Sequence, residues 1–332
     1  MNILVLAPFS DSSLERLGQQ GDVTYESWIQ AGRLHDPAKL AARLRDERID
    51  IVVVEADFLT AEAFAAPTLR LAGVCRDGLN QIDIQAATDN RVPVINTPAR
   101  NGPAVAELAI GLMLALARQL PAAIAFAESG GWSPIEAYQT LRGREISGSV
   151  VGIVGLGQMG SQVASGVRGL GAKVIASDPY VSARRAKALG VKLVSLDELL
   201  RKADFVSLHT PQAKATEGLI DAAALDLMKP TAYLINTGAP NVLDHDALLE
   251  RLQARRIAGA ALDVIPGHVL PPSHPLLALD NLILTPHIGG ASGETVTRHS
   301  RMIVEDIERF LRGERPRRLA NPDALTSAGD GR

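Results

Sequence analysis

The chain has 332 residues, a formal net charge of -3 and a hydrophobic content of 46%. This length suffices for two domains with sizeable cores, and the charge gives no sign of a nucleic-acid partner. No apolar run approaches a membrane span, and the first residues resemble a strand instead of a secretory signal, so we expect no membrane partner and a cytoplasmic protein. Cys75 is the only cysteine, which excludes an internal disulfide and a thiolate metal cage.

Short apolar strands alternate with amphipathic helices along the whole chain. The predicted strands cover residues 2–7, 49–54, 71–75, 92–96, 150–154, 174–177, 205–208, 233–236, 259–262 and 282–285. The predicted helices include residues 37–46, 103–118, 158–170, 196–201, 221–227, 244–255 and 293–311. Such alternation indicates an α/β protein whose parallel sheets are covered on both faces. The stretch 128–149 has no strong period, and we interpret it as a connector.

A glycine-rich turn follows the strand predicted at 150–154. Gly155 permits a tight turn into the next helix, Gly157 lets the backbone approach a pyrophosphate, and Gly160 lets helix and strand pack closely. Asp178 ends the following strand, where a carboxylate accepts hydrogen bonds from the hydroxyls of a ribose. Strand, glycines, helix and acid in this order predict a dinucleotide-binding site with the phosphates at the helix N-terminus. The carboxylate favours NAD, while Arg184 and Arg185 keep NADP open as the less favoured cofactor.

Several motifs in a fixed order resemble the D-isomer-specific 2-hydroxyacid dehydrogenases, a family that includes phosphoglycerate and formate dehydrogenases. They are Val-Gly-Ile-Val-Gly-Leu-Gly-Gln-Met-Gly (151–160), Leu-His-Thr-Pro (208–211), Met-Lys-Pro (228–230), Asn-Thr (236–237), Gly-Ala-Ala-Leu-Asp-Val (259–264), Leu-Thr-Pro-His-Ile-Gly-Gly (284–290) and, upstream, Asn-Thr-Pro (96–98) with Asn101. The resemblance covers nearly the whole chain and implies two Rossmann-like doubly wound domains with the active site in the cleft between them. It assigns residues 1–98 and 293–332 to a flavodoxin-like substrate-binding domain, and residues 99–292 to an NAD-binding Rossmann domain.

The resemblance also implies which residues bind the cofactor. These are the glycine-turn residues Gly155, Gly157, Gln158, Met159 and Gly160, the ribose acid Asp178, and residues at later strand ends: His209, Thr210, Pro211, Thr237, Gly238, Ala239, Asp263, His287 and Gly289. No grouping of histidines and acids has metal-ligand spacing, so no metal is expected.

The catalytic positions depart from the family pattern at two of three places. The family uses an Arg to hold the substrate's carboxylate, a His to exchange the hydroxyl proton, and a Glu to orient that His. His287 falls at the His position, but Ala239 stands where the Arg is expected and His268 stands where the Glu is expected. A neutral His268 is able to orient His287, whereas a protonated one lowers its neighbour's pKa.

The missing Arg directs attention to other cations in the first domain. The loop Arg76-Asp77-Gly78 replaces a glycine-containing loop whose amides bind the substrate carboxylate in relatives, and Asn101 lies in the motif after it. Arg76 or Arg100 is the available anchor for an organic acid. We therefore take Arg76 with His287 and His268 as catalytic candidates, and Arg76, Asp77, Gly78 and Asn101 as substrate-binding candidates.

Three functions are compatible with this pattern. The first is an NAD-dependent oxidoreductase that moves a hydride between nicotinamide and a 2-hydroxy or 2-oxo acid, with His287 as acid and base. The second is a redox-neutral isomerase or lyase that uses bound NAD transiently, and the third is an NAD(H)-binding sensor or scaffold. The resemblance also implies a homodimer, with the apolar helix at 104–116 and the connector at the interface.

Overall fold

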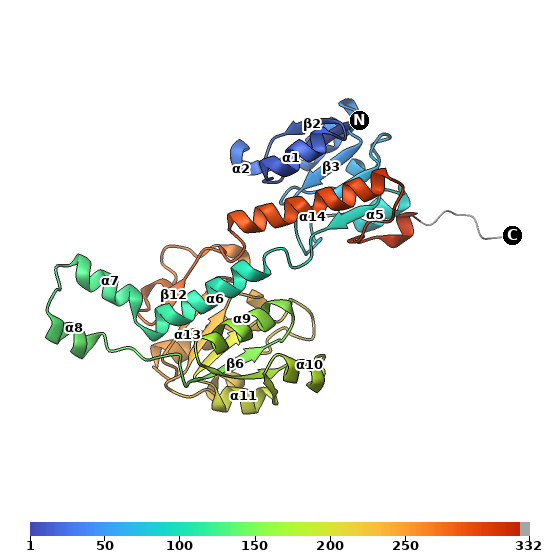
Figure 1. Ribbon diagram of the computed structural model, residues 1–332. Helices are drawn as coiled ribbons and strands as arrows, with labels where there is room; N and C mark the ends of the chain where they lie inside the picture. Colours follow the sequence, from blue (N-terminus) through green and yellow to red (C-terminus); the bar gives the residue numbers. More distant parts are fainter. Residues whose placement is uncertain (326–332) are drawn as a thin grey trace. The chain divides into compact units, whose positions relative to one another are not determined.

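The computed structural model describes residues 1–325, except for the side chain of His268, and divides the chain into two compact units (Figure 1). Unit 1 consists of Met1–Arg100 together with the described residues from Ser292 onward, and unit 2 consists of Asn101–Ala291. Each unit is built around its own parallel sheet, as the alternation of strands and helices predicted.

Unit 1 contains a five-stranded sheet in the order β2-β1-β3-β4-β5. Its strands are β1 (Asn2–Val5), β2 (Asp22–Tyr25), β3 (Ile51–Val54), β4 (Leu71–Val74) and β5 (Val94–Asn96). Every residue of β3 and β4 is buried, which is why these central strands are continuous apolar runs. The strand order is that of a doubly wound fold, in which ligands bind beyond the carboxyl ends of the strands.

Helices cover both faces of this sheet. They are α1 (Asp11–Gly18), α2 (Trp28–Ala31), α3 (Pro37–Asp46), α4 (Ala61–Phe64), α5 (Ile84–Asp89), α14 (Gly293–Leu311) and the short η4 (Pro322–Leu325). The side chain of Ser292 accepts a hydrogen bond from the amide of Thr295 and so caps α14. One face of α14 carries Ile303, Val304 and Ile307 into the core of unit 1. The chain therefore completes unit 1 with a helix that lies about 200 residues away in sequence.

Unit 2 contains a seven-stranded parallel sheet in the order β12-β11-β10-β9-β6-β7-β8. Its strands are β6 (Val150–Val154), β7 (Lys173–Ser177), β8 (Lys192–Leu193), β9 (Phe205–Leu208), β10 (Tyr233–Asn236), β11 (Gly259–Leu262) and β12 (Leu282–Leu284). The direction of the strand order reverses between β6 and β9. The loop that follows β6 therefore lies at the position where doubly wound sheets bind their ligands.

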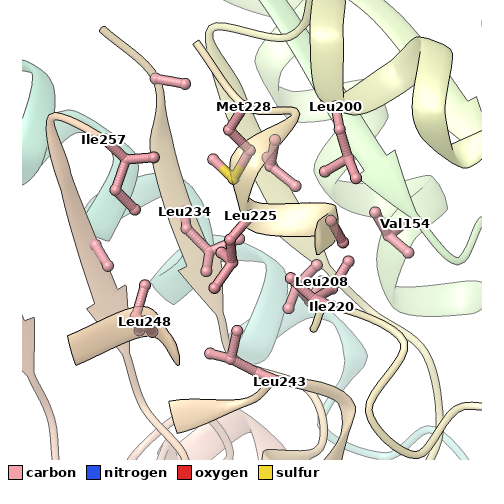
Figure 2. Close-up of a cluster of buried hydrophobic side chains, with 14 of the residues drawn as sticks. Val154, Leu200, Leu208, Ile220, Leu225, Met228, Leu234, Leu243, Leu248 and Ile257 are labelled. Atoms are coloured by element: carbon pink, nitrogen blue, oxygen red, sulfur yellow. The ribbon is translucent and has the colours of Figure 1, made fainter. Parts of the chain in front are cut away.

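Helices and short 3-10 turns surround the second sheet. They are α6 (Gly102–Ala117), α7 (Leu120–Glu128), α8 (Pro134–Thr140), α9 (Gln158–Gly169), α10 (Ala183–Ala188), α11 (Leu196–Lys202), α12 (Ala222–Asp226), η1 (Pro240–Val242), α13 (His245–Gln253), η2 (Pro266–His268) and η3 (Pro275–Ala278). Side chains alternate along β9, so Phe205 packs on one face of the sheet while Val206 and Leu208 pack on the other. Figure 2 shows the core on the Leu208 side of this sheet, where Leu225 and Met228 pack near Leu234.

The structure contains elements that the sequence prediction did not name, among them strands β2 and β8 and helices α1, α2, α4, α5, α7, α8 and α10. Strand β2 was not predicted, because its sequence Asp-Val-Thr-Tyr is short and its side chains alternate between exposed and half-buried at the sheet edge. The predicted connector 128–149 contains helix α8, which Ser133 caps by accepting from the amide of Glu136. Over residues 1–325, no single helix is sufficiently long and apolar to span a membrane; α6 and α7 pass on length and composition only as a pair bent by 61°.

Candidate functional site

The loop between β6 and α9 has a geometry that only glycines allow. Gly155 adopts a φ of 88°, and a Cβ there would lie 2.9 Å from the backbone of His209. A Cβ on Gly160 would collide with the carbonyl oxygen of Gly155. A Cβ on Gly157 would meet nothing within 4 Å. Gly155 and Gly160 are thus fixed by the fold, whereas Gly157 borders open space at the N-terminus of α9, where amides favour an anion.

Asp178 connects this loop to the end of β7. Its Oδ2 accepts from the amide of Leu156 at 2.7 Å, and its Oδ1 accepts from the amides of Tyr180 and Val181 at 2.8 and 3.2 Å. A carboxylate offers about four acceptor positions, so three are occupied by the protein. Asp178 therefore shapes the loop and keeps about one position for a ligand.

A cavity of about 690 Å³ opens beside these residues. Gly155, Gly157, Asp178, Tyr180, Ser195, Leu196, His209, Thr210, Pro211 and Thr216 are among its lining residues. Three buried polar atoms near the ends of β9 and β10 have no hydrogen-bond partner within residues 1–325: Nδ1 of His209, Oγ1 of Thr210 and Oγ1 of Thr237. Buried polar atoms are normally satisfied, so these three point to a polar ligand that completes them.

His209 is uncharged at neutral pH. Its Nε2 lies 2.8 Å from Oγ of Ser207, and burial lowers its pKa to about 4. A neutral ring offers either a donor or an acceptor at Nδ1, depending on the direction of the Ser207 hydrogen bond. Sequence analysis missed Ser207, although its position two residues before His209 on one strand places both side chains on the same face.

The loop after β10 holds the position where an Arg was expected. Asn236 folds this loop by accepting from the amide of Gly238 at 3.1 Å and donating to the carbonyl of Ala239 at 3.1 Å. The methyl group of Ala239 is buried in the apolar cluster that also contains Leu208 and Leu234. Ala239 consequently presents no polar side-chain atom to a substrate, and any anion anchor must come from elsewhere.

His287 is held in an unusual backbone conformation, with a φ of 56°. The buried carboxylate of Asp263 accepts from Oγ1 of Thr285 at 2.6 Å, from the amide of Ile288 at 2.9 Å and from the amide of Gly289 at 2.8 Å. Asp263 therefore forms hydrogen bonds to the chain on both sides of His287. A non-glycine residue that is held in the left-handed backbone conformation is typical of functional sites.

The remaining predicted positions divide between the two units. In unit 2, Asn101 precedes α6, and a Cβ on Gly290 would lie 3.2 Å from its Nδ2, so Asn101 adjoins the loop of His287. In unit 1, Arg76, Asp77 and Gly78 follow β4 and are exposed. Gln158 and Met159 open α9. The side chain of His268 lies outside the described part of the chain, so its predicted role beside His287 stays a prediction.

Arg100 belongs to a partly buried network at the carboxyl ends of the unit 1 strands. Its guanidinium lies 2.6 Å from Oε1 of Glu55 and 2.8 Å from Nδ1 of His299, and Trp28 donates to Oε2 of Glu55 at 3.1 Å. Nε2 of His299 lies 2.7 Å from the carbonyl of Pro8, so this ring is neutral with its hydrogen on Nε2. Burial lowers the pKa of His299 to about 4, and the nearby Arg100 charge acts in the same direction.

No group of three or more His, Cys, Asp or Glu residues within the described chain has the geometry to hold a metal ion. The residues at the β6, β7, β9 and β10 ends do fit a dinucleotide. Open space at Gly157 suits phosphates, the free acceptor position of Asp178 suits a ribose hydroxyl, and the unpartnered atoms of His209, Thr210 and Thr237 suit further polar groups.

A doubly wound sheet with this glycine loop and terminal acid defines a dinucleotide-binding protein of the dehydrogenase type. The chain belongs to the D-isomer-specific 2-hydroxyacid dehydrogenases: residues 110–289 match the family model "D-isomer specific 2-hydroxyacid dehydrogenase, NAD binding domain". NAD is accordingly the cofactor of unit 2.

Named relatives support this family membership. The chain is 37% identical to glyoxylate reductase of Korarchaeum cryptofilum over 276 residues, which is 83% of each protein. It is 36% identical to D-3-phosphoglycerate dehydrogenase of Mycobacterium tuberculosis over 98% of this chain, but it spans only 59% of that protein's length. The crystal structure of the TT0316 protein from Thermus thermophilus is similar with a TM-score of 0.84 and 32% identity, covering 96% of this chain and 100% of that one.

Proposed function

We propose that the protein is an NAD-dependent oxidoreductase that interconverts a 2-hydroxy acid and the corresponding 2-oxo acid. The observation that carries this proposal is the pairing of an intact dinucleotide site with His287, which a buried acid holds in a left-handed conformation. Family membership and the name of the glyoxylate reductase relative support it. Neither the redox-neutral enzyme nor the sensor gains comparable support from these observations.

Bound NADH supplies a hydride for the carbonyl carbon of the 2-oxo acid. His287 donates a proton to the carbonyl oxygen as the hydroxyl forms, and it takes that proton back in the reverse reaction. Asp263 fixes the backbone from which the imidazole of His287 projects. The backbone of His287 is therefore already in position when the reaction begins. His268 stays a candidate partner for His287 by sequence position.

Arg76 is our candidate for the substrate anchor. It is exposed, and no acidic partner of its guanidinium occurs among residues 1–325, whereas Arg100 is already paired with Glu55. An unpaired guanidinium is well suited to a carboxylate, because its donors form two parallel hydrogen bonds. Asp77 and Gly78 lie next to it in the same loop, and we propose that their backbone contributes to the same binding region.

The test is NADH consumption with a panel of 2-oxo acids, measured by absorbance. We expect turnover by the wild type, a loss of kcat of ~100-fold or more for His287→Asn, and a rise in KM of ~10-fold or more for Arg76→Gln. His274→Asn serves as the matched histidine control. NADH affinity, measured by fluorescence, should change little in His287→Asn. An NADH-binding protein that reduces no 2-oxo acid would contradict the proposal.

We also propose that the protein is a homodimer and that it is cytoplasmic. Helices α7 and α8 contain no buried residue, although they carry several large apolar side chains. Figure 1 shows both helices beyond the end of α6, away from the seven-stranded sheet. Apolar surface of this kind commonly marks a protein interface. The cytoplasmic location rests on the sequence prediction alone.

A further inference from the structure

Ser207 and His209 form a buried pair at the carboxyl end of β9. Oγ of Ser207 lies 2.8 Å from Nε2 of His209, and the two side chains are 0% and 9% exposed. The described chain supplies no second partner for the Ser207 hydroxyl and none for Nδ1 of His209. Because the ring is neutral, only one of its nitrogens carries a hydrogen, and the direction of this single hydrogen bond decides which one.

Counting the donors gives this direction. If Nε2 of His209 donated to Ser207, the serine hydroxyl would be a buried donor without an acceptor, and Nδ1 would be a buried acceptor without a donor. If Ser207 donates to Nε2 instead, the hydrogen on Nδ1 is the only donor left without a partner. Each buried polar group that lacks a partner is costly, so the second arrangement is favoured. His209 accordingly carries its hydrogen on Nδ1.

The hydrogen on Nδ1 needs an acceptor that the described chain does not supply. His209 lines the cavity of about 690 Å³ together with Gly157 and Asp178, the residues that suit phosphates and a ribose hydroxyl. The phosphate turn also adjoins His209, because a Cβ on Gly155 would lie 2.9 Å from its backbone. An oxygen atom of the cofactor's diphosphate is the acceptor that fits this place.

This cavity offers the cofactor no cationic side chain. Among the described residues that line it there is no lysine or arginine. Gln158 and Met159, which open α9 after the phosphate turn, are uncharged as well. The diphosphate therefore depends on backbone amides at the helix N-terminus and on neutral side-chain donors. A donor that already points in the right direction is valuable in such a site, because binding then requires no reorganisation.

We propose that Ser207 is a positioning residue for the cofactor, whose hydroxyl holds His209 in the tautomer that donates from Nδ1 to an oxygen of the diphosphate. The hydroxyl of Ser207 is used by the ring, so Ser207 acts through His209 and does not itself bind the cofactor. The pair sets the affinity for the cofactor and not the choice of acid, so this role goes beyond the proposed function.

The tautomer is measured in the protein without cofactor by 15N NMR of the imidazole rings, which distinguishes a ring nitrogen that carries a hydrogen from one that does not. The signals of His209 are identified as those that the His209→Asn protein lacks. We expect Nδ1 to carry the hydrogen in the wild type, and we expect Ser207→Ala to populate the other tautomer. A wild-type ring with its hydrogen on Nε2 overturns the proposal.

Dissociation constants for NADH, measured by fluorescence, test the donor. His209→Leu should weaken NADH binding by ~10-fold, whereas His209→Asn, whose amide keeps a donor near the place of Nδ1, should stay within ~3-fold of the wild type. Ser207→Ala should weaken binding by ~3-fold in the wild-type background and have no effect in the His209→Asn background. Ser149→Ala, which removes a buried hydroxyl that donates to Ile146 before β6, is the control and should leave the affinity unchanged.

A change of packing is separated from the loss of the hydroxyl by a further variant. Ser207→Thr keeps the hydroxyl but alters the packing, so it should retain the wild-type tautomer and affinity. Melting curves are compared for all variants. Equal effects of Ser207→Ala in both backgrounds, or a loss in Ser207→Thr as large as in Ser207→Ala, would assign Ser207 to packing and overturn its positioning role.

Shorter ligands locate the acceptor. ADP-ribose and adenosine are titrated against bound NADH, and their dissociation constants follow from the fluorescence that is lost. His209→Leu should weaken ADP-ribose as much as NADH and leave adenosine within ~2-fold, because adenosine has no diphosphate. A loss for NADH alone, or an equal loss for adenosine, overturns the assignment to the diphosphate. None of these measurements involves turnover, so their failure and the failure of the proposed function are distinguishable.

Discussion

Two buried histidines make the stability of the protein depend on pH. Burial lowers the pKa values of His209 and His299 from 6.5 to about 4 in the folded chain. The unfolded chain binds protons at these positions near pH 6.5, so folding becomes less favourable as the pH falls from 6.5 towards 4. Each histidine should therefore cost roughly 3 kcal/mol of unfolding free energy across that window.

His299→Gln tests this expectation, because glutamine retains a donor and an acceptor but does not titrate. The difference in unfolding free energy between pH 7 and pH 4, from urea denaturation, should be smaller in the variant by roughly 2–3 kcal/mol. Each protein's unfolding free energy at pH 4 is compared with its own value at pH 7. Packing that the variant loses lowers both values equally, so it cancels in the difference. An unchanged pH dependence would show that His299 is not kept neutral by its surroundings.

The contacts of single residues show where prediction from the sequence stops. The glycine loop and Asp178 could be identified because their residues lie within one strand-helix-strand segment with a fixed order. The pairs of Arg100 with Glu55 and with His299 join residues that are 45 and 199 positions apart, and nothing local in the sequence specifies them. Glu55 directly follows a buried strand, which is the one signal that could have placed it among the site residues.

At the scale of elements, the loop between β12 and α14 depends on a single acid. Asp263→Asn replaces one acceptor by a donor that faces the hydroxyl of Thr285 or the amides of Ile288 and Gly289. We expect a loss of ~1–3 kcal/mol in unfolding free energy and a drop in kcat of ~10-fold or more, because His287 is no longer held in place. NADH affinity should stay near the wild-type value.

The control for this prediction is Asp280→Asn, which breaks only the exposed pair with Arg255. Exposed pairs contribute about 0–1 kcal/mol, so its stability and kcat should be close to those of the wild type. A fall in NADH affinity in Asp263→Asn with an unchanged kcat would instead assign Asp263 to direct contact with the cofactor, as the family resemblance implied.

Elements with strong local patterns were predicted well. Buried apolar runs such as β3, β9 and β11 could be recognised because both faces of a parallel strand are covered. Strand β2 was not predicted because an edge strand buries only part of one face. Helix α8 was not predicted because none of its side chains is buried in the chain. Apolar periodicity arises from burial, so elements that bury little carry little signal.

At the scale of the whole molecule, the surface of α7 and α8 departs from the rule that large apolar side chains are covered. Trp132, Ile135 and Tyr138 are 80%, 73% and 69% exposed. Trp132 lies between the two helices, and Ile135 and Tyr138 lie on α8 three positions apart, on one side of the helix. Aromatic and aliphatic side chains arranged in this way favour association with a second copy of the chain.

We therefore expect the wild type to sediment as a dimer of 35.2 kDa chains and the triple variant Trp132→Ser/Ile135→Ser/Tyr138→Ser to sediment as a monomer. None of the three side chains is buried in the single chain, so the variant's unfolding free energy, measured where both proteins are monomeric, should change by only ~0.5 kcal/mol per site. The double variant Leu170→Ser/Leu277→Ser removes exposed apolar groups from other elements and should remain dimeric. Because α7 and α8 add no buried residue to the core of unit 2, we attribute their apolar composition to the proposed association of two chains. A wild type that sediments as a monomer, or a triple variant that stays dimeric, would contradict this explanation.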